Sequence, residues 1–192
     1  MREQRAREIK EEFLNSAFNY LINHGLENTS IRDLCKGTGI SVGSLYYWFD
    51  GGKDEIYISA AKYGLAKVAD ELFKFAFENM HDLRGFFDVC LEEIAKHKLE
   101  LRLIYQIATS PVYGGRMRDA ALDLNSDYEK YIKELADTID FTPDLLTPNV
   151  YIFISIVLDY AVWDDYEVTK KQLEYLYSIM SVQMQFVKAT KN

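Results

Sequence analysis

The chain has 192 residues, of which 48% are hydrophobic and only three are proline, so it can bury a sizeable core as one large domain or two smaller ones. Its net charge of −8 falls entirely within residues 54–192, because residues 1–53 carry seven basic and seven acidic side chains. An acidic surface repels nucleic acid, so only the neutral first quarter is expected to approach a polyanion. The start of the chain, with eight charged residues among the first twelve, is unlike a secretory signal.

The two cysteines, Cys35 and Cys90, lie far apart and form no C-x-x-C pair. This spacing predicts neither a disulfide framework nor a zinc site and is typical of a reducing compartment. The longest uncharged apolar stretch, residues 145–158, has 14 residues and contains Pro148, whereas a membrane helix needs about 20. We therefore expect a cytoplasmic protein with no metal, no cofactor and no membrane partner.

Apolar residues at helical spacing dominate the chain, and the alternation typical of strands is nearly absent. This pattern predicts an all-α fold of about nine helices. The first helix carries an apolar stripe at Ile9, Phe13, Ala17 and Leu21, and it ends before Gly25, which has the position of a left-handed cap.

The next two helices are predicted from their capping residues. A capping-box pattern at Ser30 and Asp33 predicts a short second helix that ends just before Gly39. Ser41 is placed to cap a third helix that ends near Phe49. After a second turn, further helices are expected at about 53–77, 82–97, 99–109, 116–139, 149–165 and 169–189.

The stretch GISVGSLYYWF combines two glycines with four consecutive aromatic side chains. On a helical wheel Leu45 and Phe49 face inward, whereas Gly43, Tyr46 and Tyr47 project from the opposite side. Glycine inside a helix costs about 1 kcal/mol relative to alanine, so its outward position suggests close approach by another molecule. Tyrosine hydroxyls suit phosphate oxygens. The pattern predicts a helix-turn-helix unit that binds DNA, although a corner of a helical bundle has the same spacing.

These residues resemble the DNA-binding segment of the tetracycline-repressor (TetR) family of bacterial transcriptional regulators. The resemblance runs through FLNSAFNYLINHGLENTSIRDLCKGTGISVGSLYYWF and continues into KDEIY, or about residues 5–65. It implies a DNA-binding domain over residues 1–52 and a helical effector-binding and dimerisation domain over residues 53–192. It also implies a homodimeric, ligand-responsive repressor that binds a palindromic operator in double-stranded DNA.

The resemblance assigns roles to particular residues. Thr29, Ser30 and Tyr46 would contact phosphates, and Lys53 would contact another phosphate at the start of the fourth helix. The residues near the major groove would be Ser41, Val42, Gly43, Ser44 and Tyr47. Two features depart from the family pattern: Val42 stands where lysine, arginine or proline is frequent, and the DGGK turn is one residue longer than usual.

The last two predicted helices carry more apolar surface than one chain can cover. The segment NVYIFISIVLDYAVW is apolar around most of its circumference, and the last helix has one apolar row through Leu173 and another through Tyr175. Burial on two sides favours a two-fold dimer with a four-helix interface. The expected interface residues are Tyr151, Ile154, Leu158, Leu173, Leu176, Met180 and Val187.

Aromatic residues in the predicted fifth to eighth helices suggest a cavity for a small-molecule effector. The candidate lining residues are Phe86, Phe87, Tyr105, Tyr113, Tyr128, Asp159 and Trp163. A carboxylate buried alone on an apolar helix is costly, so Asp159, with Glu92, is a candidate to bind a cationic aromatic effector. The alternative is that the rings form core and that Asp159 lies at a solvated edge or pairs with Arg102.

No feature of the sequence predicts an enzyme. Cys90, Glu93 and His97 share one helical face, but this spacing is common in amphipathic helices. The sequence contains no phosphate loop, no G-x-S-x-G motif and no metal-ligand pair. The alternative function is a helical adaptor without DNA binding, which would lack the salt-sensitive DNA affinity of a DNA reader.

Overall fold

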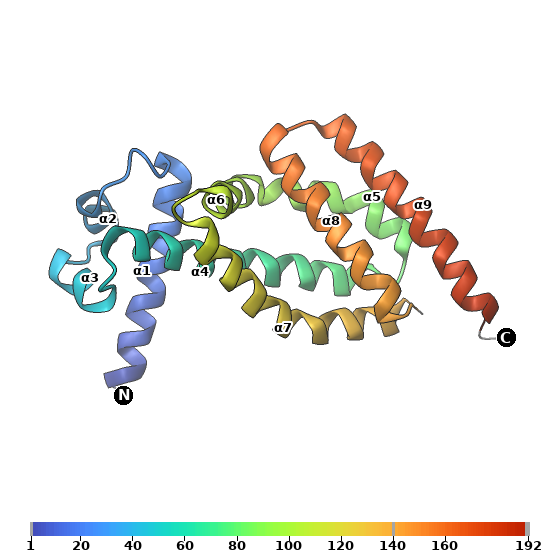
Figure 1. Cartoon of the computed structure of the whole chain (residues 1–192), viewed down its shortest axis with the longest axis horizontal. Coiled ribbons are helices and arrows are strands. Elements are labelled where there is room, and N and C mark those ends of the chain that lie inside the picture. Colours follow the sequence, from blue (N-terminus) through green and yellow to red (C-terminus); the bar gives the residue numbers. More distant parts are fainter. Residues whose placement is uncertain (1, 140, 191–192) are drawn as a thin grey trace. The chain divides into compact units, whose positions relative to one another are not determined.

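Helices account for all the regular secondary structure in the part of the chain that the computed structural model describes, residues 2–139 and 141–190 (Figure 1). Side chains are described for residues 4–117, 129–139 and 141–190. The nine helices in these ranges are α1 (Arg2–His24), α2 (Ile31–Thr38), α3 (Val42–Trp48), α4 (Gly52–Asn79), α5 (Leu83–Lys96), α6 (Lys98–Thr109), α7 (Gly114–Thr138), α8 (Pro143–Trp163) and α9 (Tyr166–Thr190). The predicted all-α fold is confirmed.

The predicted start of α8 near residue 149 is wrong, because the helix begins at Pro143. Thr142 provides an extended N-cap, and Pro143 occupies the first turn, where its missing backbone N–H needs no partner. Pro148 lies inside the helix. A proline there removes one backbone hydrogen bond, which the packing of the helix outweighs, so the helix continues through it.

The first of two compact units comprises Met1–Val68 and Leu103–Ala121. Helices α1, α2, α3 and the first part of α4 share one buried core in this unit. The most deeply buried side chains of this core include Phe13, Ala17, Leu21, Leu34, Leu45, Phe49, Ile56, Ile107 and Met117. The segment expected to bind DNA, residues 1–52, therefore lies within one packed unit.

The second unit comprises Ala69–Arg102 and Leu122–Asn192, and within it α9 packs against both α8 and α5. The buried amide of Asn149 on α8 donates to Gln183 Oε1 on α9 at 2.8 Å. Arg84 on α5 donates to both carboxylate oxygens of Glu174 on α9, at 2.8 and 2.9 Å. The core of this unit includes Phe86, Phe87, Leu91, Ile94, Leu146, Leu176 and Met180.

The C-terminal end of α8 is tied to the start of α6. Arg102 donates from Nε to Ala161 O at 2.9 Å and from Nη2 to Val162 O at 3.4 Å. Lys98 forms an ion pair with Asp164, the left-handed residue that caps the helix. Cationic side chains at this end suit the unpaired carbonyl groups and the negative end of the helix dipole.

By length and composition, α8 is also apolar enough to cross a membrane, since its most apolar 18-residue stretch has a mean hydropathy of 1.6. Only 33% of that stretch is buried within the chain. The buried residues, which include Leu146, Ile156 and Tyr160, pack inside the second unit. This helix is therefore a core helix with an additional outward apolar face.

Candidate nucleic-acid interface

A hydrogen-bond network fixes the turn between α1 and α2. Gly25 ends α1 with a φ of 78°, in the left-handed region that favours glycine, as predicted. Thr29 Oγ1 donates to Gly25 O at 2.6 Å, and the Thr29 side chain is only 2% exposed. The structure therefore corrects the predicted phosphate contact of this side chain, because its hydroxyl is buried and bonded inside the protein.

A complete capping box begins α2. The Ser30 hydroxyl accepts from the Asp33 backbone N–H at 3.2 Å, and the Ser30 N–H donates to the Asp33 carboxylate at 3.0 Å. Hydrogen bonds from the Ser30 hydroxyl and then from its backbone N–H hold the pKa of Asp33 below its usual range. At the other end, Gly39 has a φ of 71° and turns the chain toward α3. The predicted capping box and glycine turn are confirmed.

Both ends of α3 are hydrogen-bonded. Ser41 Oγ accepts from the Ser44 N–H at 3.1 Å and lies 2.9 Å from Ser44 Oγ. The Phe49 N–H donates to Leu45 O at 2.8 Å. Ser41 is therefore the N-cap that the sequence predicts, and the short helix is held in a defined position.

The aromatic run of α3 is divided between the core and the solvent. Leu45 and Phe49 are buried, and the Phe49 ring packs 5.7 Å from the Phe13 ring of α1. Tyr46 and Tyr47 are 53% and 86% exposed, and Tyr47 is the most exposed of the large hydrophobic side chains described. The prediction that both phenols point away from the protein is confirmed.

Gly43 lies on the same outward face, and the fold does not require glycine there. A Cβ added at Gly43 would meet only Ser41 Oγ at 3.9 Å, an ordinary van der Waals distance. A Cβ at Gly64 of α4, by contrast, would collide with the Phe18 ring. Glycine weakens a helix by about 1 kcal/mol, and packing within the protein gives no reason for glycine at position 43.

Two lysines border this surface. Lys53 Nζ at the start of α4 lies 5.0 Å from the centroid of the Tyr57 ring, and Lys10 Nζ on α1 lies 4.6 Å from that of Phe49. Asp50 is exposed in the turn before α4. Both ammonium groups add positive charge beside α3, and a phosphate contact by Lys53 stays a prediction.

Comparison with known proteins bears directly on this unit. Residues 13–60 match the family model for bacterial regulatory proteins of the tetR family. The matched range holds α2, α3 and the parts of α1 and α4 that share their core. Residues 13–60 therefore resemble the DNA-binding segment of tetR-family regulators.

Two curated relatives match this chain over a longer span. It is 23% identical over 153 residues to the HTH-type transcriptional repressor AcnR of Corynebacterium glutamicum and 22% identical over 153 residues to AcnR of Corynebacterium efficiens. Each alignment covers 78% of this chain and 78% of the relative. The resemblance predicted from sequence is confirmed, and the family is one of regulators that bind DNA rather than enzymes.

The residues predicted to line an effector cavity are divided between the two units. Phe86 and Phe87 are core residues of the second unit. Tyr105 and Tyr113 belong to the first unit, where the Tyr113 hydroxyl donates to Asp54 Oδ1 at 3.2 Å. Aromatic content alone cannot distinguish rings of the hydrophobic core from rings that line a cavity. Here Phe86 and Phe87 are buried in the core, whereas Tyr105 is exposed.

The remaining predicted cavity residues also need correction. Asp159 and Trp163 are exposed, so neither is enclosed in a cavity. The alternative of a solvated edge holds for Asp159, whereas Arg102 bonds to backbone carbonyls of α8 instead of to a carboxylate. Tyr128 lies outside the described side chains.

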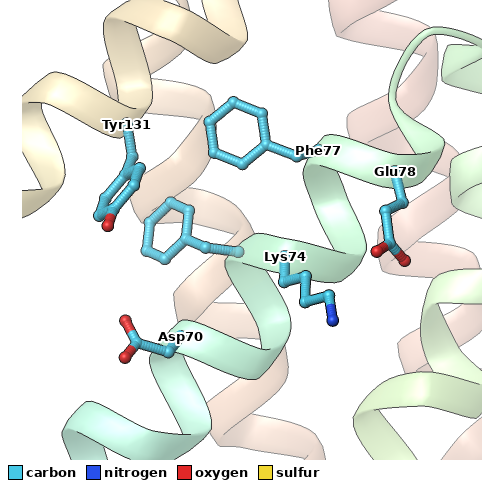
Figure 2. A pocket seen from close by; sticks show the side chains of 6 residues that line it. Asp70, Lys74, Phe77, Glu78 and Tyr131 are labelled. Carbon is cyan, nitrogen blue, oxygen red and sulfur yellow. The ribbon is translucent and has the colours of Figure 1, made fainter.

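An open groove of about 450 Å³ lies elsewhere in the second unit (Figure 2). It is lined by Asp70, Phe73, Lys74, Phe77, Glu78 and Tyr131. Tyr131 of α7 stacks on Phe73 with ring centroids 5.7 Å apart and meets Phe77 edge-on at 6.0 Å. The predicted lining residues all lie in helices that follow α4, so these groove residues were not among them, although the spacing of 70, 73, 74, 77 and 78 places them on one helical face.

The four α9 residues predicted for the dimer interface face the interior of their own chain. Leu173, Leu176, Met180 and Val187 are buried within the second unit. The other row is outward, since Tyr175, Val182 and Phe186 are 71%, 66% and 67% exposed. Both rows have helical spacing, so periodicity alone does not decide which one packs against α5 and α8. On α8, Tyr151 and Ile154 are exposed and Leu158 is half-buried.

His97 at the end of α5 faces acidic side chains rather than Cys90. Its Nε2 atom lies 3.6 Å from Glu71 Oε2 and 3.9 Å from Glu93 Oε1. Cys90 Sγ donates to Phe87 O, and burial raises the pKa of the Cys90 thiol to about 12. Such a thiol is not ionised near neutral pH and is no nucleophile. Among the described residues, no cluster of three or more metal-ligating side chains occurs.

Proposed function

We propose that this protein is a transcriptional repressor that reads operator DNA with α3. The observation that carries the proposal is the outward face of α3, where Tyr46 and Tyr47 accompany the bare backbone of Gly43 on a helix bonded at both ends. Phenol hydroxyls suit phosphate oxygens, and a helix with no side chain at one position can lie close to base edges. The names of the two AcnR relatives support a repressor.

In the proposed complex, different parts of this surface contact different parts of the duplex. Ser30, Tyr46 and Lys53 would contact phosphates. Ser41, Val42, Gly43, Ser44 and Tyr47 would lie in the major groove. We place the DNA-binding domain at residues 1–52, the effector-binding and dimerisation domain at residues 53–192, and the protein in the cytoplasm.

The proposed active form is a homodimer that pairs the outward faces of α8 and α9. Ile154 on α8 and both Val182 and Phe186 on α9 are exposed apolar side chains. Several exposed apolar side chains on two packed helices mark a candidate interaction surface. A two-fold pair would present two α3 helices to DNA about 34–36 Å apart, which is one helical turn and predicts a palindromic operator.

The proposed effector site is the groove on α4 and α7. Phe73, Phe77 and Tyr131 supply aromatic surfaces. The same lining contains two carboxylates, Asp70 and Glu78, and one ammonium group, Lys74, so its net charge is negative. Figure 2 shows Asp70 on the side of α4 nearer to Tyr131, with Lys74 projecting away from that ring. These groups favour a small planar aromatic cation.

The proposed response to the effector depends on α4. Residues 52–68 of this helix belong to the unit that contains α3, and residues 69–79 belong to the unit that contains the groove. A ligand that shifts α4 would therefore alter the DNA-binding unit through one continuous helix. A coupling free energy of about 1–3 kcal/mol changes DNA affinity by roughly 5- to 150-fold.

Selection of bound duplexes from a random DNA pool tests the DNA-binding function. We expect the enriched sequences to share a palindrome, and their affinity to fall at least tenfold between about 50 and 200 mM salt. Tyr47→Ala should weaken binding while the dimer and its helix content stay unchanged. If no sequence is enriched and no duplex binds at the lower salt concentration, the helical adaptor is the better function.

Two matched probes test the effector site. N-methylquinolinium and 1-methylnaphthalene have nearly the same shape but differ in charge. We expect only the cation to raise the melting temperature and to change affinity for the selected operator. Asp70→Asn should abolish both effects, whereas Asp137→Asn, an exposed carboxylate outside the groove lining, should retain them. Equal responses to the two probes would contradict a site for cations.

A further inference from the structure

The reading surface of α3 lacks the side chains that proteins use most often to identify bases. From Gly39 to Phe49 there is no arginine, lysine, asparagine, glutamine, aspartate, glutamate or histidine. Guanine is most often read by two hydrogen bonds from arginine or lysine, and adenine by two from asparagine or glutamine. Residues in α3 can make neither of these paired contacts, so this helix must distinguish bases by other groups.

The hydroxyl groups on this surface are partly occupied by the fold. Ser41 Oγ accepts from the backbone N–H of Ser44, and the two serine hydroxyls lie 2.9 Å apart, within hydrogen-bond distance. A hydroxyl can make three hydrogen bonds, so Ser41 keeps one free position and Ser44 keeps two. Serine discriminates weakly between bases because it can donate or accept. The exposed Tyr47 hydroxyl can also donate or accept, so the base-reading group with a fixed chemical character is the isopropyl group of Val42.

Val42 is displayed in a position that suits contact with a flat apolar partner. Its side chain is 40% exposed although it belongs to a helix with a buried opposite face. The neighbouring residue Gly43 has no side chain, and the fold leaves room for a Cβ there. The glycine therefore removes the atoms that would otherwise hold Val42 away from the floor of a groove.

We propose that Val42 selects thymine by packing against its C5 methyl group in the major groove. The thymine methyl is the only apolar group that a base pair presents in that groove, and apolar side chains are its usual partners. Gly43 permits the close approach that this contact needs. The inference rests on the proposed function, and it adds the base that the operator half-site presents to α3: an A·T pair with the thymine facing Val42.

Deoxyuridine provides a direct test because it differs from thymidine only by the absent methyl group. After an operator has been selected from the random pool, each thymine of a half-site is replaced in turn by deoxyuridine, and affinity is measured. We expect a loss at one thymine per half-site of roughly fourfold, the value for one buried methyl-sized group. Replacing that thymine by 5-methylcytosine should bind more tightly than replacing it by cytosine.

Variants assign the effect to Val42. The Val42→Ala variant should bind the operator equally well whether the sensitive half-site position holds thymidine or deoxyuridine. The matched control is Val89→Ala on α5, since Val89 is 39% exposed and lies outside the DNA-binding unit; this variant should keep the full preference for thymidine. Circular dichroism and melting temperature verify that both variants fold. Val42→Thr, which keeps one methyl group, should retain part of the preference for thymidine.

The outcomes separate this inference from the proposed function. Failure to enrich any DNA would remove the function itself. Enrichment of an operator in which no deoxyuridine replacement weakens binding would leave the repressor intact and overturn the thymine contact. A methyl preference that persists unchanged in Val42→Ala would overturn the assignment to Val42.

Discussion

The hydroxyl group of Tyr57 on α4 donates a hydrogen bond of 2.5 Å to the backbone carbonyl of Thr29, 28 residues earlier in the chain. The same hydroxyl lies 3.3 Å from Leu26 O, and the Tyr57 ring is buried. Thr29 directly precedes Ser30, the N-cap of α2. The start of α4 therefore holds the turn from which α2 begins, so this phenol supports the proposed DNA-binding surface without belonging to it.

Removing this hydroxyl should destabilise the protein. Tyr57→Phe leaves the carbonyl of Thr29 without its buried donor, and we expect the free energy of unfolding to fall by about 1–2 kcal/mol. Urea denaturation followed by circular dichroism measures the change. Tyr46→Phe is the control, because a hydroxyl on an exposed ring should change stability by less than about 0.5 kcal/mol. Identical unfolding curves for Tyr57→Phe and the natural protein would show that the bond adds no stability.

Alkaline pH should destabilise the fold through two buried groups. Burial raises the pKa of the Cys90 thiol from 9.0 to about 12, and burial, followed by the charges of Asp33 and Asp54, raises the pKa of the Tyr57 phenol from 10.0 to about 12. Above pH 9 the unfolded chain therefore binds fewer protons than the folded one, and stability falls as pH rises. Each group contributes at most about 1.4 kcal/mol per pH unit.

Two variants test whether Cys90 and Tyr57 cause this dependence of the unfolding free energy on pH. Cys90→Ala should flatten the dependence of unfolding free energy on pH between pH 9 and 10, where the thiol of the unfolded chain ionises. Tyr57→Phe should leave that range unchanged and reduce the slope above pH 10. Urea titrations at half-unit steps provide the measurement. An unchanged slope below pH 10 in Cys90→Ala would mean that the thiol is not protected by burial.

The helix-turn-helix unit is predictable from sequence because short-range chemistry specifies it. The capping pair Ser30 and Asp33, the left-handed glycines Gly25 and Gly39, and the N-cap Ser41 act within a few residues, and each keeps its predicted role in the structure. Thr29 is the exception on this surface. Its hydroxyl turns inward because it can satisfy the Gly25 carbonyl, a local bond that a transferred family role does not reveal.

The second unit is less predictable because its surfaces are decided by long-range packing. The rows of α9 through Leu176 and through Val182 have equal helical spacing, yet only the first packs against the rest of the unit. The cavity prediction fails for the same reason, since rings such as Phe86 pack in the core while Trp163 faces solvent. Sequence periodicity identifies apolar faces, and tertiary contacts decide which of them remain outward.

Replacing Gly43 by alanine should improve folding and impair function. The added methyl group has room in the protein, so the variant should gain up to about 1 kcal/mol in unfolding free energy from higher helix propensity. In the proposed complex the same methyl group would project toward the DNA, so it should weaken operator binding at least fivefold. Urea denaturation and operator titration measure the two effects. A stabilised variant with unchanged DNA affinity would show that no close approach occurs at this position.

Introducing a charge on the outward row of α9 should separate the chains without unfolding them. Phe186→Glu places a carboxylate on a surface that is exposed in the single chain but buried in the proposed dimer, where an unpaired charge is strongly unfavourable. We expect sedimentation analysis to find monomers, with helix content retained and operator affinity lost. Leu176→Ala is the contrasting variant, because this buried side chain supports the second unit itself and its truncation should cost about 2–5 kcal/mol. A dimer that survives Phe186→Glu would place the interface elsewhere on the chain.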